Sequence, residues 1–202
     1  MVMRMTRILP AAALSLLGLA AATGCGGRHR DELPVVAGFA PGQGPVGTSV
    51  IITGGGFTGI AAVSFGGQPS VAYHVDGANQ ITAIVPAEGV TGAITVENPK
   101  GLGTSYTSFL VQPAITGIQT PAGAAVAAGA AGDVIVLVGS GFYDLVSVAI
   151  NGEAPGSANA STFTYHDPNH VTVQVGSATP KGAGQLVLTA SGLTATAPFT
   201  VD

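Results

Sequence analysis

The stretch GTSVIITGGGFTGIAAVSFGG, residues 47–67, returns later in the chain as GDVIVLVGSGFYDLVSVAING, residues 132–152. The two stretches align over 21 positions without a gap, at an offset of 85 residues. Four glycines, one phenylalanine and one valine are identical; the pairs are Gly47/Gly132, Gly54/Gly139, Gly56/Gly141, Gly67/Gly152, Phe57/Phe142 and Val63/Val148. A repeat of this kind indicates two copies of one structural unit.

The similarity continues beyond this stretch once small insertions are allowed. Asn79–Thr82 matches Asn169–Thr172, and Phe109–Val111 matches Phe199–Val201. We therefore expect one unit over residues 33–112 and a second over residues 113–202. The boundary near Gln112 and Pro113 leaves little linker, which predicts units placed end to end with restricted bending.

Short β-rich runs separated by Gly, Pro, Asn or Asp indicate an all-β fold. In the first copy the predicted strands are residues 49–53, 62–65, 70–75, 80–85, 93–97 and 105–111. Apolar and polar residues alternate in Ile81–Val85, as expected for a strand with one buried face. The second copy differs by an Ala- and Gly-rich segment, Ala122–Gly132, for which we expect a flexible loop rather than a helical turn.

The first copy resembles the IPT/TIG module, an immunoglobulin-like β-sandwich. The family pattern is present as a G-T-x-V-x-I-x-G-x-x-F core at Gly47–Phe57, a V-x-F-G hairpin at Val63–Gly66, an I-x-x-x-V-P strand at Ile81–Pro86 and a closing F-x-V at Phe109–Val111. The second copy is similar but departs at Asp133, Asn151 and Gly176, where Thr, Gly and Pro are usual. The resemblance implies two tandem immunoglobulin-like (E-set) β-sandwiches and implies little about function.

The first residues are typical of a signal peptide, which we place at residues 1–24. Arg4 and Arg7 give a positive start, and the apolar run Ile8–Ala22 has the length of a signal core, short for a membrane span. The run ends in Ala-Thr-Gly-Cys, which resembles the bacterial lipobox with Ala22 where Leu is usual. By that resemblance Cys25 is the lipidated first residue of the mature chain, followed by a short tether, residues 25–32.

The single cysteine is consistent with lipidation. Exported proteins usually use cysteines in pairs, and Cys25 has no second cysteine in this chain. The alternative is an incidental thiol near an ordinary cleavage site, in a protein that is secreted. A lipoprotein without Asp after the cysteine is expected, by analogy, in an outer membrane. We therefore predict an exported cell-envelope protein whose partner is the membrane, through its lipid anchor.

The charge balance excludes several partners. Charged residues make up 8% of the chain, against roughly 25% in an average soluble domain. From Cys25 onward four basic and ten acidic residues give a net charge of −6, and beyond Leu33 the basic residues are Lys100 and Lys181. Nucleic-acid binding requires clustered Lys and Arg, so we expect none, although DNA-binding relatives of this fold exist.

A catalytic constellation is not recognisable in the sequence. There is no G-x-S-x-G elbow, and the acids are spread singly along the chain. We predict no enzyme activity and no cofactor. The one cluster that could ligate a metal is His166, Asp167 and His170; the competing interpretation is a turn, because Asp-Pro-Asn is typical turn chemistry.

Aromatic side chains are the other candidates for binding. Tyr143, Phe163 and Tyr165 could stack against sugar rings. The second copy also carries about five extra residues within Glu153–Thr164, and loops on a sandwich commonly carry recognition, so we expect a binding surface there if one exists.

The function favoured by the sequence is a non-catalytic surface lipoprotein whose modules bind a protein or serve as a spacer. The alternative is a carbohydrate-binding accessory or adhesin module, in which Tyr143 or Tyr165 contacts the glycan. A third hypothesis is a metal-dependent activity at His166 and His170.

Overall fold

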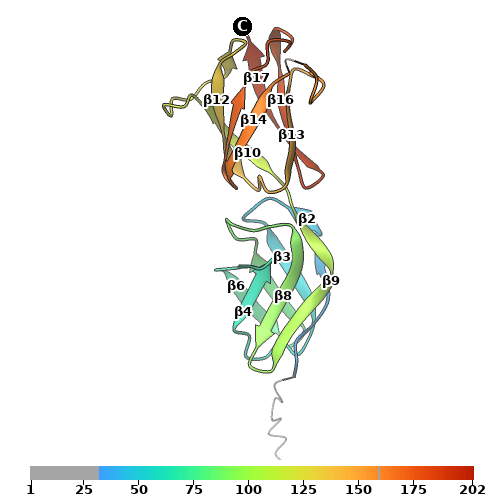
Figure 1. Ribbon diagram of the computed structural model, residues 1–202. Coiled ribbons are helices and arrows are strands. Elements are labelled where there is room, and N and C mark those ends of the chain that lie inside the picture. The colour runs from blue at the N-terminus through green and yellow to red at the C-terminus, as the bar shows by residue number, and fades with distance from the viewer. Residues whose placement is uncertain (1–31, 159) are drawn as a thin grey trace, which may run out of the picture.

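The computed structural model describes residues 32–158 and 160–202, which form an all-β molecule of two sandwiches placed end to end (Figure 1). The predicted signal peptide and Cys25 lie outside the described residues. None of the described residues belongs to a helix long and apolar enough to cross a membrane. The described N-terminal residues and the C-terminus lie at opposite ends of the long axis (Figure 1).

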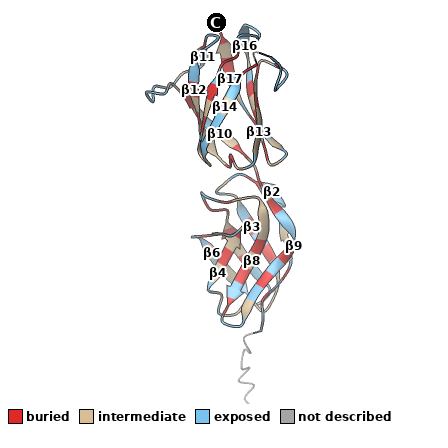
Figure 2. Ribbon diagram, viewed as in Figure 1, coloured by how far each residue is buried: buried red, intermediate tan, exposed pale blue. Residues whose placement is uncertain are grey.

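The first sandwich packs a four-stranded sheet, β1-β3-β7-β6, against a five-stranded sheet, β2-β9-β8-β4-β5. Its strands are β1 (Val35–Ala40), β2 (Gln43–Gly44), β3 (Ser49–Gly55), β4 (Ala62–Phe65), β5 (Gln68–Pro69), β6 (Tyr73–Gly77), β7 (Gln80–Ile84), β8 (Gly92–Asn98) and β9 (Gly101–Val111). Alternate residues point inward, so buried and exposed positions alternate along β3 and β8 (Figure 2). The inward residues form one hydrophobic core that includes Phe57, Phe65 and Phe109.

The second sandwich repeats this plan with two four-stranded sheets, β10-β12-β15-β14 and β11-β17-β16-β13. Its strands are β10 (Ala114–Gln119), β11 (Ala128–Gly129), β12 (Val134–Ser140), β13 (Leu145–Ile150), β14 (Thr162–Asp167), β15 (His170–Gln174), β16 (Gly182–Ala190) and β17 (Leu193–Val201). A separate core, which contains Phe142 and Phe199, fills the space between them. The predicted fold class of two immunoglobulin-like sandwiches is confirmed.

The shared Gly-x-Gly-Phe element has the same role in both sandwiches. Phe57 and Phe142 are completely buried. A Cβ added at Gly54 would overlap the carbonyl oxygen of Val35 and the Phe57 ring, and Gly139 has the equivalent neighbours. The repeat therefore conserves glycine where the first strand and the phenylalanine press against the backbone.

Two sequence predictions are wrong in detail. The strand predicted at residues 70–75 is β6, Tyr73–Gly77. Ser70 belongs to the preceding pairing, because its N–H donates to the Val63 carbonyl at 2.8 Å and its buried hydroxyl lies within hydrogen-bond distance of the carbonyls of Ala72 and Ile84. The segment Ala122–Gly132 is not simply a loop. It contains β11, which pairs in parallel with β17, and Ala125 forms a bridge with Gln119.

Candidate functional site at the junction of the two sandwiches

The connection between the sandwiches is two residues long, Gln112 and Pro113. The Gln112 N–H donates to the carbonyl of Gly44 in the first sandwich at 2.9 Å. Its carbonyl oxygen lies against Gly141 of the second, where an added Cβ would approach it to 2.9 Å. Pro113 is buried. The linker is thus held by both sandwiches, which limits their relative motion.

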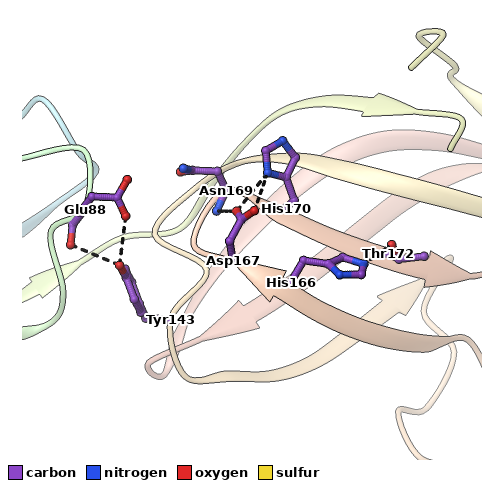
Figure 3. A network of polar contacts seen from close by, with 7 residues as sticks. All are labelled: Glu88, Tyr143, His166, Asp167, Asn169, His170 and Thr172. Atoms are coloured by element: carbon purple, nitrogen blue, oxygen red, sulfur yellow. Dashed lines mark hydrogen bonds and ion pairs between the residues drawn. The ribbon is translucent and has the colours of Figure 1, made fainter. Parts of the chain in front are cut away.

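Tyr143 crosses the junction to Glu88. Tyr143 follows the core residue Phe142, and Glu88 lies in the turn between β7 and β8. The tyrosine hydroxyl lies 3.4 Å from both the backbone carbonyl and the Oε2 atom of Glu88 and can donate its one hydrogen to either (Figure 3). Burial and the nearby Glu88 charge raise the pKa of the Tyr143 hydroxyl.

Tyr165 lies close to the same acidic groups. Its side chain is 43% exposed on β14, an edge strand. Partial burial raises the pKa of the Tyr165 hydroxyl, and the charges of Asp167, Glu88 and Asp144 raise it further. Tyr143 contacts Glu88 and precedes Asp144, and the Phe142 N–H donates to the carbonyl of Pro168 at 3.1 Å, next to the end of β14 that carries Tyr165 and Asp167. Two tyrosines and three carboxylates are therefore placed around the junction, which combines aromatic surface with hydrogen-bond acceptors. We call Glu88, Tyr143, Asp144, Tyr165 and Asp167 the junction site.

The two histidines of the predicted metal cluster make separate contacts with different partners (Figure 3). His170 Nδ1 contacts both Asp167 carboxylate oxygens at 3.0 Å, whereas His166 Nε2 contacts the Thr172 hydroxyl at 2.6 Å. The Asn169 N–H donates to Asp167, which lowers the pKa of that carboxyl. Among residues 32–158 and 160–202, no group of three His, Cys, Asp or Glu side chains is arranged to hold a metal ion. The arrangement supports the interpretation as a turn between β14 and β15.

Phe163 and parts of the inserted loop are built into the fold of the second sandwich. Phe163 is partly buried against the core of the second sandwich. Glu153, the first residue of the predicted loop 153–164, is buried, and the last three residues of that range belong to β14. A groove of about 310 Å³ lies beside this loop, at the end away from the junction; it is lined by Ala131, Gly132, Ala160, Thr162, Gln174, Val175, Gly176 and Ser177.

The sequence pattern makes Tyr143 and Tyr165 candidates for binding but gives no reason to consider Glu88. Glu88 is a single exposed acid in a turn, 55 residues from Tyr143, and nothing in the repeat pattern relates the two. The contact between Tyr143 and Glu88 becomes visible only in three dimensions, where the second sandwich is stacked on the first.

Comparison with known protein families gives one match. The family model described as IPT/TIG domain matches residues 34–111, which is the first sandwich. No curated protein matches the chain.

Three solved structures that align with this chain are longer than it is. A surface glycan-binding protein of Prevotella bryantii aligns with a TM-score of 0.50 at 14% identity, covering 84% of this chain and 42% of that one. A structure determined with xylogluco-oligosaccharide aligns with a TM-score of 0.46 at 20% identity, covering 84% of this chain and 41% of its own. A glycan-binding protein from a xyloglucan utilization locus of Bacteroides uniformis gives 0.36 at 20% identity, with coverages of 84% and 49%. The chain spans less than half of each, and the likeness concerns the fold.

Proposed function

We propose that this chain is a non-catalytic surface element that binds glycan at the junction site. The observation that carries the proposal is the contact of Tyr143 with Glu88 across the junction, next to the end of β14 where Tyr165 and Asp167 lie. The C–H faces of a sugar ring pack on aromatic rings, and its hydroxyl groups donate to carboxylates. The held linker supports this role, because a contact surface shared by two domains requires a fixed orientation.

The second sandwich is proposed to be an IPT/TIG domain like the first. The second sandwich shares the Gly-x-Gly-Phe element. It also keeps the positive φ angle of the first sandwich at two positions where a glycine is replaced by another residue. Asn151 has φ 50° where Gly66 has φ 56°, and Asp144 has φ 51° where Gly59 has φ 61°. The Asn151 side chain donates to the carbonyls of Pro180 and Gly182, which fixes a conformation that glycine adopts freely.

Titration with polysaccharides tests the glycan proposal. The full mature chain is run in native gels that contain neutral and acidic polysaccharides, among them xyloglucan, and binding is quantified by calorimetry. We expect retardation by at least one neutral polysaccharide and a loss of about tenfold in affinity for Tyr165→Ala, because a lost ring contact of about 1.4 kcal/mol corresponds to a factor of ten. Tyr165→Phe keeps the ring and is expected to retain most of the affinity.

A second candidate function is a spacer or protein-binding element. The extended arrangement, with the described ends of the chain on opposite sides, favours it (Figure 1). Crosslinking in intact cells, enrichment and mass spectrometry separate the two proposals. A reproducible protein partner, together with failure to bind any polysaccharide, contradicts glycan binding and supports the spacer or adaptor role.

The proposed location is the cell surface, with Cys25 as the lipid-bearing residue. Two or more acyl chains give stable anchoring, at about 0.8 kcal/mol per buried CH₂. Wild type is expected to incorporate labelled fatty acid and to stay in the membrane fraction, whereas Cys25→Ser is expected to lose the label and to be released. Equal membrane retention of the two proteins contradicts the anchor.

A further inference from the structure

An irregularity in β9 presents one tyrosine to solvent on the first sandwich. In the β8–β9 ladder Ala93 is opposite Ser108 and Thr95 is opposite Thr104. Ile94 therefore faces three residues, 105–107, instead of one. This is a β-bulge with two extra residues, and bulges commonly redirect a side chain.

A buried serine fixes the bulge. Ser105 is only 8% exposed. Its hydroxyl oxygen accepts the N–H of Ile94 at 2.9 Å and the hydroxyl donates to the carbonyl of Thr107 at 2.7 Å. The side chain thus satisfies a backbone donor that the bulge removes from the ladder, and it closes the turn around Tyr106. The turn is held in one conformation before any ligand arrives.

The fold does not require this bulge. The equivalent β16–β17 ladder of the second sandwich runs from Gly182 paired with Val201 to Ala190 paired with Leu193 without a shift in register. Tyr106, at the centre of the bulge, is 96% exposed, so its ring contributes little to folding. The extra residues displace no core side chain, because Phe109 and Ile94 on either side of them are completely buried.

The surroundings of Tyr106 are neutral and rich in hydroxyl groups. Thr104, Thr107 and Ser108 are exposed next to it on β9, and Thr95 is half-buried on the neighbouring strand β8. The nearest charged residues of the two strands, Glu97 and Lys100, lie toward the far end, where Glu97 pairs with Leu102. An anionic polymer would require cations at this surface. A rigid ring beside neutral hydroxyl groups matches an uncharged sugar, which stacks one face and exchanges hydrogen bonds at its edges.

We infer that Tyr106 is the centre of a second contact site, on the outer face of the five-stranded sheet, for an uncharged polysaccharide chain. The inference rests on the proposed glycan binding and adds a site that is separate from the junction site. Two sites on one rigid molecule bind a long chain more tightly than either does alone, so the polymer gains more than a short oligosaccharide does.

The experiment compares Tyr106→Ala, Tyr165→Ala and wild type on the same neutral polysaccharides and on their short oligosaccharides. Tyr106→Ala is expected to lower affinity for the polymer about tenfold, and thermal unfolding is expected to be unchanged because the ring is exposed. Ile51→Ala is the control for loss of an exposed apolar side chain, since Ile51 is 44% exposed on β3, in the other sheet of the same sandwich. Tyr106→Phe is expected to bind like wild type.

The outcomes separate the inference from the proposed function. Reduced binding by Tyr106→Ala, with Ile51→Ala unaffected, supports the second site. Unchanged binding by Tyr106→Ala, with binding lost in Tyr165→Ala, overturns the second site and leaves the proposed function standing. Binding lost in Tyr106→Ala but retained in Tyr165→Ala supports the Tyr106 site and contradicts the junction site. A wild-type chain that binds no polysaccharide overturns both.

Discussion

Glu153 in the second sandwich stands where Gln68 stands in the first, three residues after the end of the equivalent strand. Gln68 belongs to β5, which pairs with Phe65 and covers the edge of β4. In the second sandwich the Glu153 N–H still donates to the Ile150 carbonyl at 3.1 Å, but the Ile150 N–H donates to the Glu153 carboxylate at 3.0 Å. A side chain thus replaces part of a strand pairing and protects the sheet edge.

Replacing Glu153 by Gln is expected to destabilise the second sandwich by about 2 kcal/mol. The Oε2 atom accepts the Ser161 N–H at 3.2 Å and the Thr179 hydroxyl at 2.6 Å. The NH2 group of a glutamine amide would face either the Ile150 N–H, or the Ser161 N–H and the Thr179 hydroxyl. Urea unfolding measures the change, with Glu97→Gln, an exposed acid of the first sandwich, as the control. Equal stability of Glu153→Gln and wild type contradicts the role.

Acid should weaken the second sandwich through the same residue. Burial raises the pKa of Glu153, but the hydrogen bonds from Ser161, Thr179 and Ile150 lower it more, to below its ordinary value of 4.5. A carboxyl with a lowered folded pKa stabilises the protein above its unfolded pKa, and this stability is lost as the pH falls through the folded pKa. The difference in unfolding free energy between wild type and Glu153→Gln should therefore be constant near neutral pH and shrink below 4.5. A difference independent of pH contradicts this assignment.

Alanine at Gly54 should destabilise the first sandwich by about 3 kcal/mol or more. The new Cβ would overlap the Val35 carbonyl, which belongs to a paired strand that cannot move freely. The adjacent Gly55→Ala is the control, because nothing lies within 4 Å of an added Cβ there. We expect that control to change stability by less than about 0.5 kcal/mol. Similar stabilities of the two variants in chemical denaturation would exclude a steric role for Gly54.

Asn98→Ala should loosen the first residues of the described chain. Asn98 is 3% exposed, and its amide donates to the Glu32 carbonyl at 2.7 Å while its Oδ1 accepts the Lys100 N–H at 2.8 Å. Truncation leaves buried groups without partners, at about 2 kcal/mol. Hydrogen exchange at the Lys100 amide should accelerate. Asn79→Ala removes a single exposed hydrogen bond to Gly54 and serves as the comparison.

Tyr143→Phe should widen the range of angles between the sandwiches without unfolding either. The variant keeps the ring and removes the hydroxyl that donates to Glu88. Residual dipolar couplings or small-angle scattering measure the effect. Each sandwich should keep its stability within about 0.5 kcal/mol, because the hydroxyl contacts no core residue. An unchanged angular distribution means that the held linker alone sets the orientation.

The core of the fold could be predicted from the sequence, but the contacts between the two sandwiches could not. Glycine and phenylalanine recur at fixed spacing because steric overlap at Gly54 and Gly139 leaves no other choice, and such constraints are visible in one sequence. Strand limits near Ser70 were predicted wrongly, since the Ser70 N–H pairs with the Val63 carbonyl and its buried hydroxyl lies against the carbonyls of Ala72 and Ile84 in the turn before β6.

The contacts at the junction could not be predicted from the sequence pattern of either copy alone. Tyr143 lies at the position of Thr58 in the first copy, so the repeat gives no hint that it reaches another domain. The burial of Glu153 was also missed, because a lone acid beside Gly and Pro is ordinarily an exposed loop residue. Both features arise from tertiary placement that local patterns do not encode.

The end-to-end arrangement has a mechanical consequence. Tension between Glu32 and Asp202 passes through both sandwiches and through the short linker. In the first sandwich β2 runs parallel to β9, pairing Gln43 with Leu110, and in the second β11 runs parallel to β17. Pulling displaces β2 and β9, and likewise β11 and β17, in opposite directions along their length. The hydrogen bonds between two such strands are then loaded at the same time and do not break one after another. Such a chain resists stretching and transmits a load between whatever its two ends hold.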